Sequence, residues 1–480
     1  MDKKLSQQDD FVNIPLVVDL DETLIRTDLL FESFLMLIAV SPVRAIYALF
    51  KVLSGRSELK SYIADHIDIR ADLLPYDEAV IDCINVAKNS GKDVYLVSAS
   101  DDRYVKAVAD HLGLFTNAYG SSREYNLSGL NKAKKLVTLF GKGGFDYIGD
   151  NKKDIPIWEE AAQAFFAGPN VGSLLKEVSG GKVVSDNRPC LLSYIKCLRV
   201  HQWLKNLLIF VPFFLDHTFS GYVFVVAFFA FIAFSLCASS VYIINDLLDL
   251  NNDRTHSRKK NRPFASGEIP IIYGMIVAPF LLIVSAVIGF CVSSQFLLLM
   301  MLYFILTLSY SVFLKRIPLV DVVLLAVLYG LRILAGGVAT YHSVSSWFLA
   351  FAIFLFLFLA MIKRLVEVGD SIRNNSTLAS GRGFAREDLP LLSSLSCTAG
   401  YMSILIFSLY ITNPVTLEIY QTPELLWGVC MLLLFWVNRL LLVAHRGGMD
   451  DDPMIYALTD RISLVVGFFV LVLFFSAVYF

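Results

Sequence analysis

Residues 245–267 read NDLLDLNNDRTHSRKKNRPFASG and lie between two long apolar runs. The first half of this segment contains Asn245 and the acids Asp246, Asp249 and Asp253. On a helix, these three carboxylates would stand at i, i+3 and i+7 and share one face. Like charges so close repel unless a cation lies between them, and Mg²⁺ bound by carboxylates and phosphate oxygens is one such cation. The segment therefore predicts a site for magnesium and a diphosphate.

The second half of the segment is basic. Its cations are Arg254, Arg258, Lys259, Lys260 and Arg262. Cations in these positions could pair with the phosphate oxygens that a metal ion leaves uncovered. A site for a phosphorylated ligand at a membrane surface is therefore our first hypothesis. A polar connecting loop with ordinary salt bridges is the alternative.

The composition differs between the two parts of the chain. Hydrophobic residues make up 56% of its 480 residues, against about 45–50% in soluble proteins. Residues 1 to about 200 have the composition of a soluble α/β domain, whereas most of the remainder consists of apolar runs of membrane length. The net charge is −2 and no basic stripe is present, so we expect no nucleic-acid partner.

Nine apolar runs follow residue 200, and we expect a bundle of about nine transmembrane helices, or eight if the first run is too short to cross. The runs lie near 204–219, 221–244, 270–291, 295–314, 318–340, 346–362, 392–412, 425–444 and 462–480. Lys and Arg gather in alternate loops, near 254–262, 315–316, 363–386 and 446–461. By the positive-inside rule, we expect an integral protein of the cell (inner) membrane whose N-terminal part and charged loops are cytoplasmic.

Three segments of the N-terminal part have the pattern of buried strands that end in polar residues. They are IPLVVDLDETL (14–24), DVYLVSAS (93–100) and FDYIGD (145–150). Asp19 and Asp21, two residues apart, would point to the same side of the first strand. Helical patterns between the strands predict a parallel, Rossmann-like sheet, whose ligands bind at the carboxyl ends of the strands.

These motifs resemble those of the haloacid dehalogenase (HAD) superfamily of aspartate-dependent phosphatases. The family pattern is DxDxT, then Ser or Thr, then Lys, then GDxxxD. Its matches here are Asp19, Asp21, Thr23, Ser98, Lys132, Gly149, Asp150 and Asp154. Lys134 and Lys135 remain alternatives to Lys132. The resemblance implies an α/β HAD domain over residues 1–170 with a helical cap near 29–90.

The same resemblance implies a phosphatase reaction. Asp19 would attack phosphorus, and Asp21 would act as general acid and then as general base. One Mg²⁺ would be bound by Asp19, the Asp21 carbonyl and Asp150. Ser98 and Lys132 would hold the transferring phosphoryl group. A degenerate, non-catalytic domain is the alternative.

Two segments are placed to touch a membrane without crossing it. The apolar run 34–40 is too short to span a bilayer, so it either packs in the core of the cap or contacts the membrane surface or a lipid substrate. Residues 171–198 form the expected linker and interfacial helix. Arg199, Trp203 and Lys205 then stand as an interfacial anchor before the first apolar run.

The aspartates at 246–253 match the first motif, NDxxDxxxD, of the UbiA superfamily of intramembrane prenyltransferases, which the chain resembles. The second motif departs from that family: ordinary members have DxxxD, and this chain has Lys363, Arg364, Glu367 and Asp370. Three further segments are similar to the decaprenyl-phosphate phosphoribosyltransferase branch. They are RVHQWLKN (199–206), KKNRPFASG (259–267) and YSVFLKRIPLVDV (310–322).

This resemblance implies a UbiA-type membrane domain over residues 199–480. It would transfer 5-phosphoribose from 5-phosphoribosyl diphosphate (PRPP) to a polyprenyl phosphate. Asp246, Asp249 and Asp253 would hold one or more Mg²⁺ ions on the diphosphate. The implied substrate-binding residues are Lys205, Asn206, Asn245, Lys260, Arg262, Lys363, Arg364 and Glu367. Tyr303 and Tyr310 are interpreted as packing residues.

The presence of both parts on one chain predicts two consecutive reactions. The phosphatase-like part would remove the 5-phosphate of the phosphoribosyl lipid and leave polyprenyl-phosphoryl ribose, a donor for cell-envelope glycans. Two alternatives stay open: a prenyltransferase that moves a polyprenyl group from its diphosphate to an aromatic or lipid acceptor, and a non-catalytic transporter or scaffold. The expected partners are the substrates and the lipid bilayer; the oligomeric state, a homo-oligomer included, is open.

Overall fold

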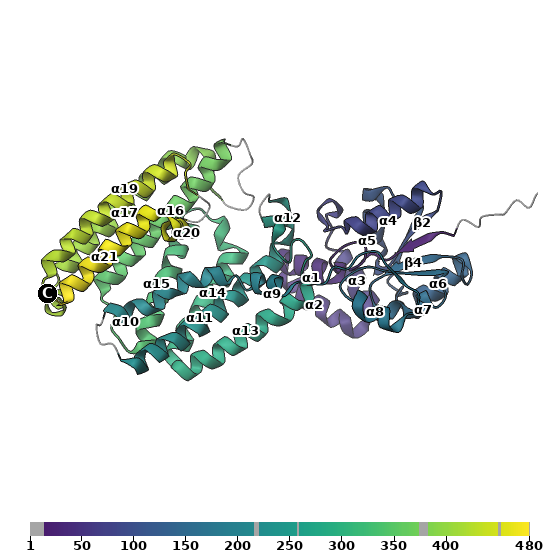
Figure 1. Ribbon diagram of the computed structural model, residues 1–480, viewed down its shortest axis with the longest axis horizontal. Helices are drawn as coiled ribbons and strands as arrows, with labels where there is room; N and C mark the ends of the chain where they lie inside the picture. The colour runs from purple at the N-terminus through teal and green to yellow at the C-terminus, as the bar shows by residue number, and fades with distance from the viewer. Residues whose placement is uncertain (1–13, 216–219, 257–258, 374–382, 450–452, 480) are drawn as a thin grey trace, which may run out of the picture. The chain divides into compact units, whose positions relative to one another are not determined.

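A computed structural model of the chain describes residues 14–215, 220–256, 259–373, 383–449 and 453–479. These residues form two compact units (Figure 1). The first unit contains the N-terminal part up to Arg199 together with Tyr242–Ala278, and the second contains Val200–Val241 and the residues from Pro279 onward. The segment at 245–267 therefore belongs to the same unit as the N-terminal sheet.

The first unit contains a six-stranded sheet in which all strand pairs are parallel. The strands are β1 Leu16–Val18, β2 Val94–Asp101, β3 Asn117–Ser121, β4 Asp146–Gly149, β5 Gln163–Phe166 and β6 Lys182–Val183. Their order is β3-β2-β1-β4-β5-β6. Leu16 and Val18 pack on one face and Val17 on the other, so β1 is apolar throughout, as a strand covered on both faces must be.

Helices cover both faces of this sheet (Figure 1). The helices and 3₁₀ turns (η) of the first unit are α1 Leu29–Val40, α2 Pro42–Lys51, η1 Val52–Ser54, α3 Arg56–Ala64, η2 Ala71–Leu73, α4 Glu78–Asn89, α5 Asp102–Leu112, α6 Leu130–Phe140, η3 Lys152–Asp154, α7 Ile155–Trp158, α8 Val171–Glu177, α9 Leu191–Cys197, α12 Leu250–Thr255 and η5 Lys259–Asn261. Apolar residues of α4 and α5 pack on one face, and those of α6, α7 and α8 pack on the other. The strand order reverses at β1 and β4, and ligands of such sheets bind at this position.

The second unit is helical, and two helices, α11 Gly221–Leu248 and α13 Ile271–Val292, have residues in both units. Its other helices are η4 Val200–Phe210, α10 Val211–Leu215, α14 Ser294–Val312, η6 Leu314–Arg316, α15 Val320–Thr340, α16 Ser346–Arg373, η7 Arg386–Asp388, α17 Leu389–Ile411, α18 Pro414–Ile419, η8 Pro423–Leu425, α19 Leu426–His445, α20 Pro453–Thr459 and α21 Arg461–Tyr479. Its core lies along α16, which packs with α15, α17 and α19.

The expected number of about nine spans is wrong, and the alternative of eight agrees with the structure. The described residues contain eight helices that are long and apolar enough to cross a membrane, and not about nine. The reason is the run at 204–219, which forms part of the 3₁₀ helix η4 and the short helix α10. Neither is long enough to span. Residues 216–219 lie outside the described residues.

The expected fold class, a HAD-type domain with a helical cap joined to a separate membrane bundle, is wrong. Residues 242–278 pack with the N-terminal residues in one unit, so the two compact units do not follow each other along the chain. The N-terminal part is a parallel sheet with helices. The domain boundaries expected at residues 170 and 199 stay predictions.

Candidate functional site

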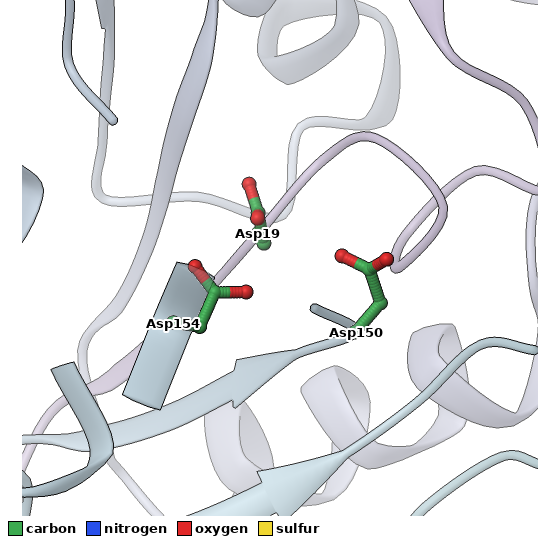
Figure 2. Close-up of side chains that lie close together, drawn as sticks. All are labelled: Asp19, Asp150 and Asp154. Atoms are coloured by element: carbon green, nitrogen blue, oxygen red, sulfur yellow. The ribbon is translucent and has the colours of Figure 1, made fainter. Parts of the chain in front are cut away.

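Three carboxylates meet where β1 and β4 end. Asp19 follows β1, Asp150 follows β4, and Asp154 ends the turn η3. One oxygen of each lies within 4.8 Å of an oxygen of each of the others, and Figure 2 shows the three side chains gathered at the end of the sheet. No second set of potential metal ligands this close occurs among the described residues. Asp19 and Asp150 thus lie together, as expected for residues at the ends of parallel strands. Asp154 is a third potential metal ligand, which the predicted set of ligands did not include.

A buried lysine neutralises part of this acidic group. Lys132, on α6, places its Nζ 2.8 Å from Asp19 Oδ1 and donates a hydrogen bond of 2.7 Å to the hydroxyl of Tyr147. The Tyr147 hydroxyl donates to Asp154 Oδ1 at 3.2 Å. The Lys132 side chain is only 2% exposed, so its charge acts on the acids with little screening by water.

Two of these acids, Asp150 and Asp154, are biased toward protonation or toward a bound cation. Burial, with the charges of Asp154 and Asp19, raises the pKa of Asp150 well above its usual range. Burial raises the pKa of Asp154 to about 6, although Lys132 opposes the change. A divalent cation would stabilise the ionised forms, and carboxylate oxygens are the ligands that Mg²⁺ prefers. The oxygens of Asp19, Asp150 and Asp154 therefore fit a magnesium ion.

Asp21 has partners of its own. Its Oδ2 accepts hydrogen bonds from the hydroxyls of Ser98 at 3.0 Å and Ser100 at 2.6 Å. Its Oδ1 accepts from the backbone N–H of Leu29 at 2.8 Å, where α1 begins. Burial raises the pKa of the Asp21 carboxyl, and the hydrogen bonds from Ser100 and Leu29 oppose the rise. The group is therefore biased toward the protonated form that a general acid needs.

Ser98 lies beside Asp21, and its expected role in holding a phosphoryl group stays a prediction. Its side chain is fully buried, and its hydroxyl donates to Asp21. Ser100 was not among the predicted site residues. The sequence could have indicated it, because residues two apart in a strand point to the same side. Ser98 and Ser100 both lie in β2, so both side chains can reach Asp21.

The aspartate-rich segment is divided between two helices. Asp246 lies near the end of α11, Asp249 precedes α12, and Asp253 lies within α12. Backbone hydrogen bonds of helical spacing continue across this break, from Asp249 N–H to the Asn245 carbonyl and from Asp253 N–H to the Asp249 carbonyl. Asp246 and Asp253 are buried, whereas Asn245 and Asp249 are half-buried.

Arginines lie between the buried acids of this segment. Nη1 of Arg262 is 3.1 Å from Asp246 Oδ1 and 2.6 Å from Asp253 Oδ2. Arg199 contacts both carboxylate oxygens of Asp246, through Nε at 3.1 Å and through Nη2. The cation that the sequence predicts between these acids is thus a guanidinium in this structure. Arg199 was predicted only as a membrane anchor. Its partner Asp246 is 47 residues away in the chain, so no short sequence motif indicates this ion pair.

The remaining cations of the segment are less enclosed. Lys260 is exposed, and Arg258 lies outside the described residues.

Burial raises the pKa of Asp253, and Arg262 lowers it. Carboxylates and arginines side by side fit a ligand that is a metal diphosphate, because the acids bind the metal and the guanidinium groups bind phosphate.

A buried ion pair joins this segment to the N-terminal helix α1. Arg254 donates to both oxygens of Glu32, at 2.5 and 3.0 Å, and to the backbone carbonyl of Ala265 at 2.9 Å. The Glu32 carboxylate also accepts from the Thr27 hydroxyl at 3.0 Å. The Arg254 and Glu32 side chains are 5% and 3% exposed, so the pair is shielded from water.

The second unit contains another buried network, around Arg364 on α16. Arg364 donates to both carboxylate oxygens of Asp321, to Glu367 and to the Tyr310 hydroxyl. The Tyr310 hydroxyl donates to Asp321 at 2.8 Å. Arg364 is predicted to bind phosphate, and here its guanidinium is directed at protein acceptors. Lys363 is half-buried.

A second buried arginine, Arg332 on α15, has neutral hydrogen-bond partners. It donates to Asn206 Oδ1 at 2.9 Å, to the carbonyl of Leu328 at 2.6 Å and to the Tyr303 hydroxyl at 2.9 Å. The amide of Asn206 donates in turn to the hydroxyl of Ser235 at 3.0 Å. Asn206 is thus tied to the bundle through Arg332, and Lys205 beside it is half-buried.

Known proteins resemble this chain in sequence. A model of the UbiA prenyltransferase family matches residues 209–458. An uncharacterized protein, y4nM, of Sinorhizobium fredii is 35% identical over 95% of this chain and 89% of its own length. A decaprenyl-phosphate phosphoribosyltransferase of Mycolicibacterium smegmatis is 28% identical over 57% of this chain and 88% of its own length.

A solved structure of a UbiA homolog from Archaeoglobus fulgidus, bound to DMAPP and Mg²⁺, is 17% identical, with a TM-score of 0.46 over 60% of this chain and all of that one. The family match covers more than half of the chain, and the eight apolar helices indicate an integral membrane protein. The chain belongs to the UbiA prenyltransferase family.

Proposed function

We propose that the protein transfers 5-phosphoribose from PRPP to a polyprenyl phosphate in a magnesium-dependent reaction. The observation that supports this most directly is the position of Arg262 between Asp246 and Asp253. This arrangement offers both a cation and two acids to a diphosphate with its metal. The relative named decaprenyl-phosphate phosphoribosyltransferase and the bases at 363–364, where ordinary family members have an acid, favour a donor with an additional phosphate.

In the proposed reaction, an oxygen of the lipid phosphate attacks the anomeric carbon of the ribose. The bond from that carbon to the diphosphate oxygen breaks, and diphosphate leaves with the bonding electrons. Bound Mg²⁺, held by Asp246, Asp249 and Asp253, would stabilise the charge of the leaving group. Arg262 and Lys260 would orient the diphosphate by charge-assisted hydrogen bonds. Lys205, Lys363 and Arg364 are the proposed partners of the other phosphates.

We also propose a phosphomonoesterase reaction at the Asp19 group. Asp19 would attack phosphorus and form an aspartyl phosphate while the ester oxygen leaves. Asp21 would protonate that oxygen and then take a proton from the water that hydrolyses the intermediate. Lys132, next to Asp19, would bind the phosphoryl oxygens. The support is the geometry of Asp19, Asp150, Asp154 and Lys132; the 5-phosphate of the transferase product is the proposed substrate.

The proposed location is the cell membrane, with both sites on the cytoplasmic side. The Lys and Arg residues gather in alternate loops, and the positive-inside rule assigns such loops to the cytoplasm. PRPP is a soluble, highly charged compound, so a cytoplasmic site would give it direct access.

The test uses purified full-length protein in detergent with Mg²⁺, labelled PRPP and a polyprenyl phosphate, and thin-layer chromatography separates the products. We expect label in the lipid fraction with the wild type and with Asp110→Asn, an exposed control carboxylate on α5. Asp246→Asn should abolish lipid labelling. Asp19→Asn should leave lipid labelling intact and stop the release of inorganic phosphate from the labelled lipid.

Each outcome separates the two proposals. Absence of label from the lipid with every form of the protein would overturn the transferase proposal. Transfer from a polyprenyl diphosphate to an aromatic acceptor would favour prenyl transfer, as the family's description implies. Lipid labelling without phosphate release, in wild type and Asp19→Asn alike, would overturn only the phosphomonoesterase.

A further inference from the structure

Helix α2 and the turn η1 expose large apolar side chains. Val43 is 77% exposed, Phe50 is 64% exposed and Leu53 is 88% exposed. Further exposed apolar residues lie among them: Val40, Ile46, Tyr47, Leu49 and Val52. A contiguous apolar surface of this kind is rare on a part of a protein that faces only water and marks a site of interaction.

The side of α2 that faces the protein is lined by small residues. Ala45 and Ala48 are buried and pack in a cluster with Leu37, Ile63 and Ile67. A helix that faces water on one side places its large apolar residues inward and its polar residues outward. In α2 the large apolar residues are on the outer side, so packing within the protein does not account for them.

Helix α2 and the turn η1 contain two cations and no acid. Arg44 is exposed, and Lys51 is half-buried and pairs with Glu58 at 3.2 Å. No acid occurs in the sequence between Glu32 and Glu58. An apolar surface with cations and no acids is typical of helices that lie in the surface of an anionic membrane.

Contacts of α1 place this helix beside the end of a membrane span. Residues 249–270 connect α11 to α13, both long and apolar enough to cross the bilayer, so this connection lies at one membrane face. Glu32, near the start of α1, pairs with Arg254. Met36, one turn later, accepts a contact of 3.6 Å from the Asn251 amide, three residues after α11 ends. From Glu32 to Met36, the contacts of α1 thus move from Arg254 to Asn251, which is closer to the end of α11. Helix α2 follows α1 directly in the chain.

We propose that α2 and η1 lie in the interface of this membrane leaflet and anchor the N-terminal sheet to the lipid. The side chains of Val43, Ile46, Phe50 and Leu53 enter the boundary between head groups and acyl chains. Arg44 contacts lipid phosphates. The anchor would keep the Asp19 group near lipid-linked substrates, and it does not depend on which reaction that group performs.

The test uses the full-length protein in nanodiscs that contain anionic lipid. A photoreactive benzoylphenylalanine replaces Phe50 in one protein and Val86 in another; Val86 lies on α4 and is 66% exposed, so it serves as a matched control. Both positions are exposed, and neither replacement disturbs the core. After irradiation, mass spectrometry of the intact protein reports lipid adducts.

We expect several-fold more lipid adduct from position 50 than from position 86, with the yield at position 50 falling when Arg44→Glu is added. Equal yields at the two positions would overturn the proposal. A crosslink from position 50 to a second copy of the chain would also overturn it, because the surface would then be a contact between protein copies.

Discussion

Arg262 contacts two acids of the aspartate-rich segment. One of its nitrogens lies within hydrogen-bonding distance of both Asp246 and Asp253. We expect Arg262→Gln to lower phosphoribosyl transfer by at least about tenfold, because a charge-assisted hydrogen bond is worth about 1.5–3 kcal/mol. Initial rates with labelled PRPP measure the effect. Arg262→Lys keeps the charge and should retain part of the rate; unchanged rates in both variants would contradict the assignment.

Asp28 gives the protein a specific dependence on pH. Its carboxylate caps α1 and accepts from the backbone N–H of Leu30 at 2.8 Å. Burial, together with the charge of Asp21, raises its pKa to about 7, against about 3.9 in an unfolded chain. The folded state then binds more protons than the unfolded state between these values, so this group makes stability fall as pH rises from about 4 to about 7.

Asp28→Asn should remove this contribution. Asparagine caps a helix about as well as aspartate, and it does not ionise. The free energy of unfolding of the variant should therefore equal that of the wild type near pH 4 and exceed it above pH 7, as followed by thermal unfolding across that range. A wild type and variant with parallel pH profiles would show that Asp28 ionises normally in the folded protein.

Among the elements, α1 has two roles. Its first N–H contacts Asp21 in the N-terminal group, and its first turn contains Glu32, the partner of Arg254 beside Asp253. We expect Glu32→Gln to lower the free energy of unfolding by about 3–5 kcal/mol, because it leaves a buried guanidinium without its counter-ion. Asp72→Asn breaks the exposed Arg70 pair, and its effect on the free energy of unfolding should be much smaller.

Chemical denaturation of both variants gives the comparison. Arg254→Met alone and the double variant Glu32→Gln/Arg254→Met complete the double-mutant cycle. If the pair acts as a unit, the second change should cost much less in the presence of the first than alone. Independent, additive effects would mean that Glu32 and Arg254 stabilise the protein through other neighbours.

Elements also show where reasoning from sequence succeeds. Asp19 and Asp150 could be predicted, because parallel strands end at one edge and β1 pairs with β4. The end of α11 at Leu248 could not be predicted, because the helical spacing of the three acids continues from α11 into α12. The partner of Arg364, Asp321, lies 43 residues earlier in the chain, and such a pairing depends on packing of α15 against α16. The same limit applies to residues 204–215, which belong to the 3₁₀ helix η4 and the short helix α10, so that the described residues contain eight candidate spans.

At the scale of the whole molecule, we expect the Asp19 group and the Asp246 group to bind metal ions under different conditions. The oxygens of Asp19, Asp150 and Asp154 already lie close together, whereas Asp246 and Asp253 are paired with arginines. We expect Mn²⁺, followed by electron paramagnetic resonance, to bind the first group without substrate. Binding at the second group should require PRPP, whose phosphates would engage the arginines.

Variants distinguish the two groups in this titration. Asp150→Asn should remove the binding seen without PRPP, and Asp246→Asn should remove only the additional binding seen with PRPP. Inorganic phosphate in place of PRPP is the control for a general effect of anions. Metal binding that is lost in Asp246→Asn without PRPP would show that the second group is preformed.

The neutral partners of Arg332 have a consequence for how the protein is made. A charge at the centre of a membrane helix costs about 2.5–3.5 kcal/mol on entry into the bilayer. Asn206 and Tyr303, which accept hydrogen bonds from Arg332, precede it in the chain, as does Ser235, the partner of Asn206. The ribosome therefore synthesises every one of these acceptors before α15 leaves the translocon, and the order of the helices along the chain lowers the barrier to inserting this arginine.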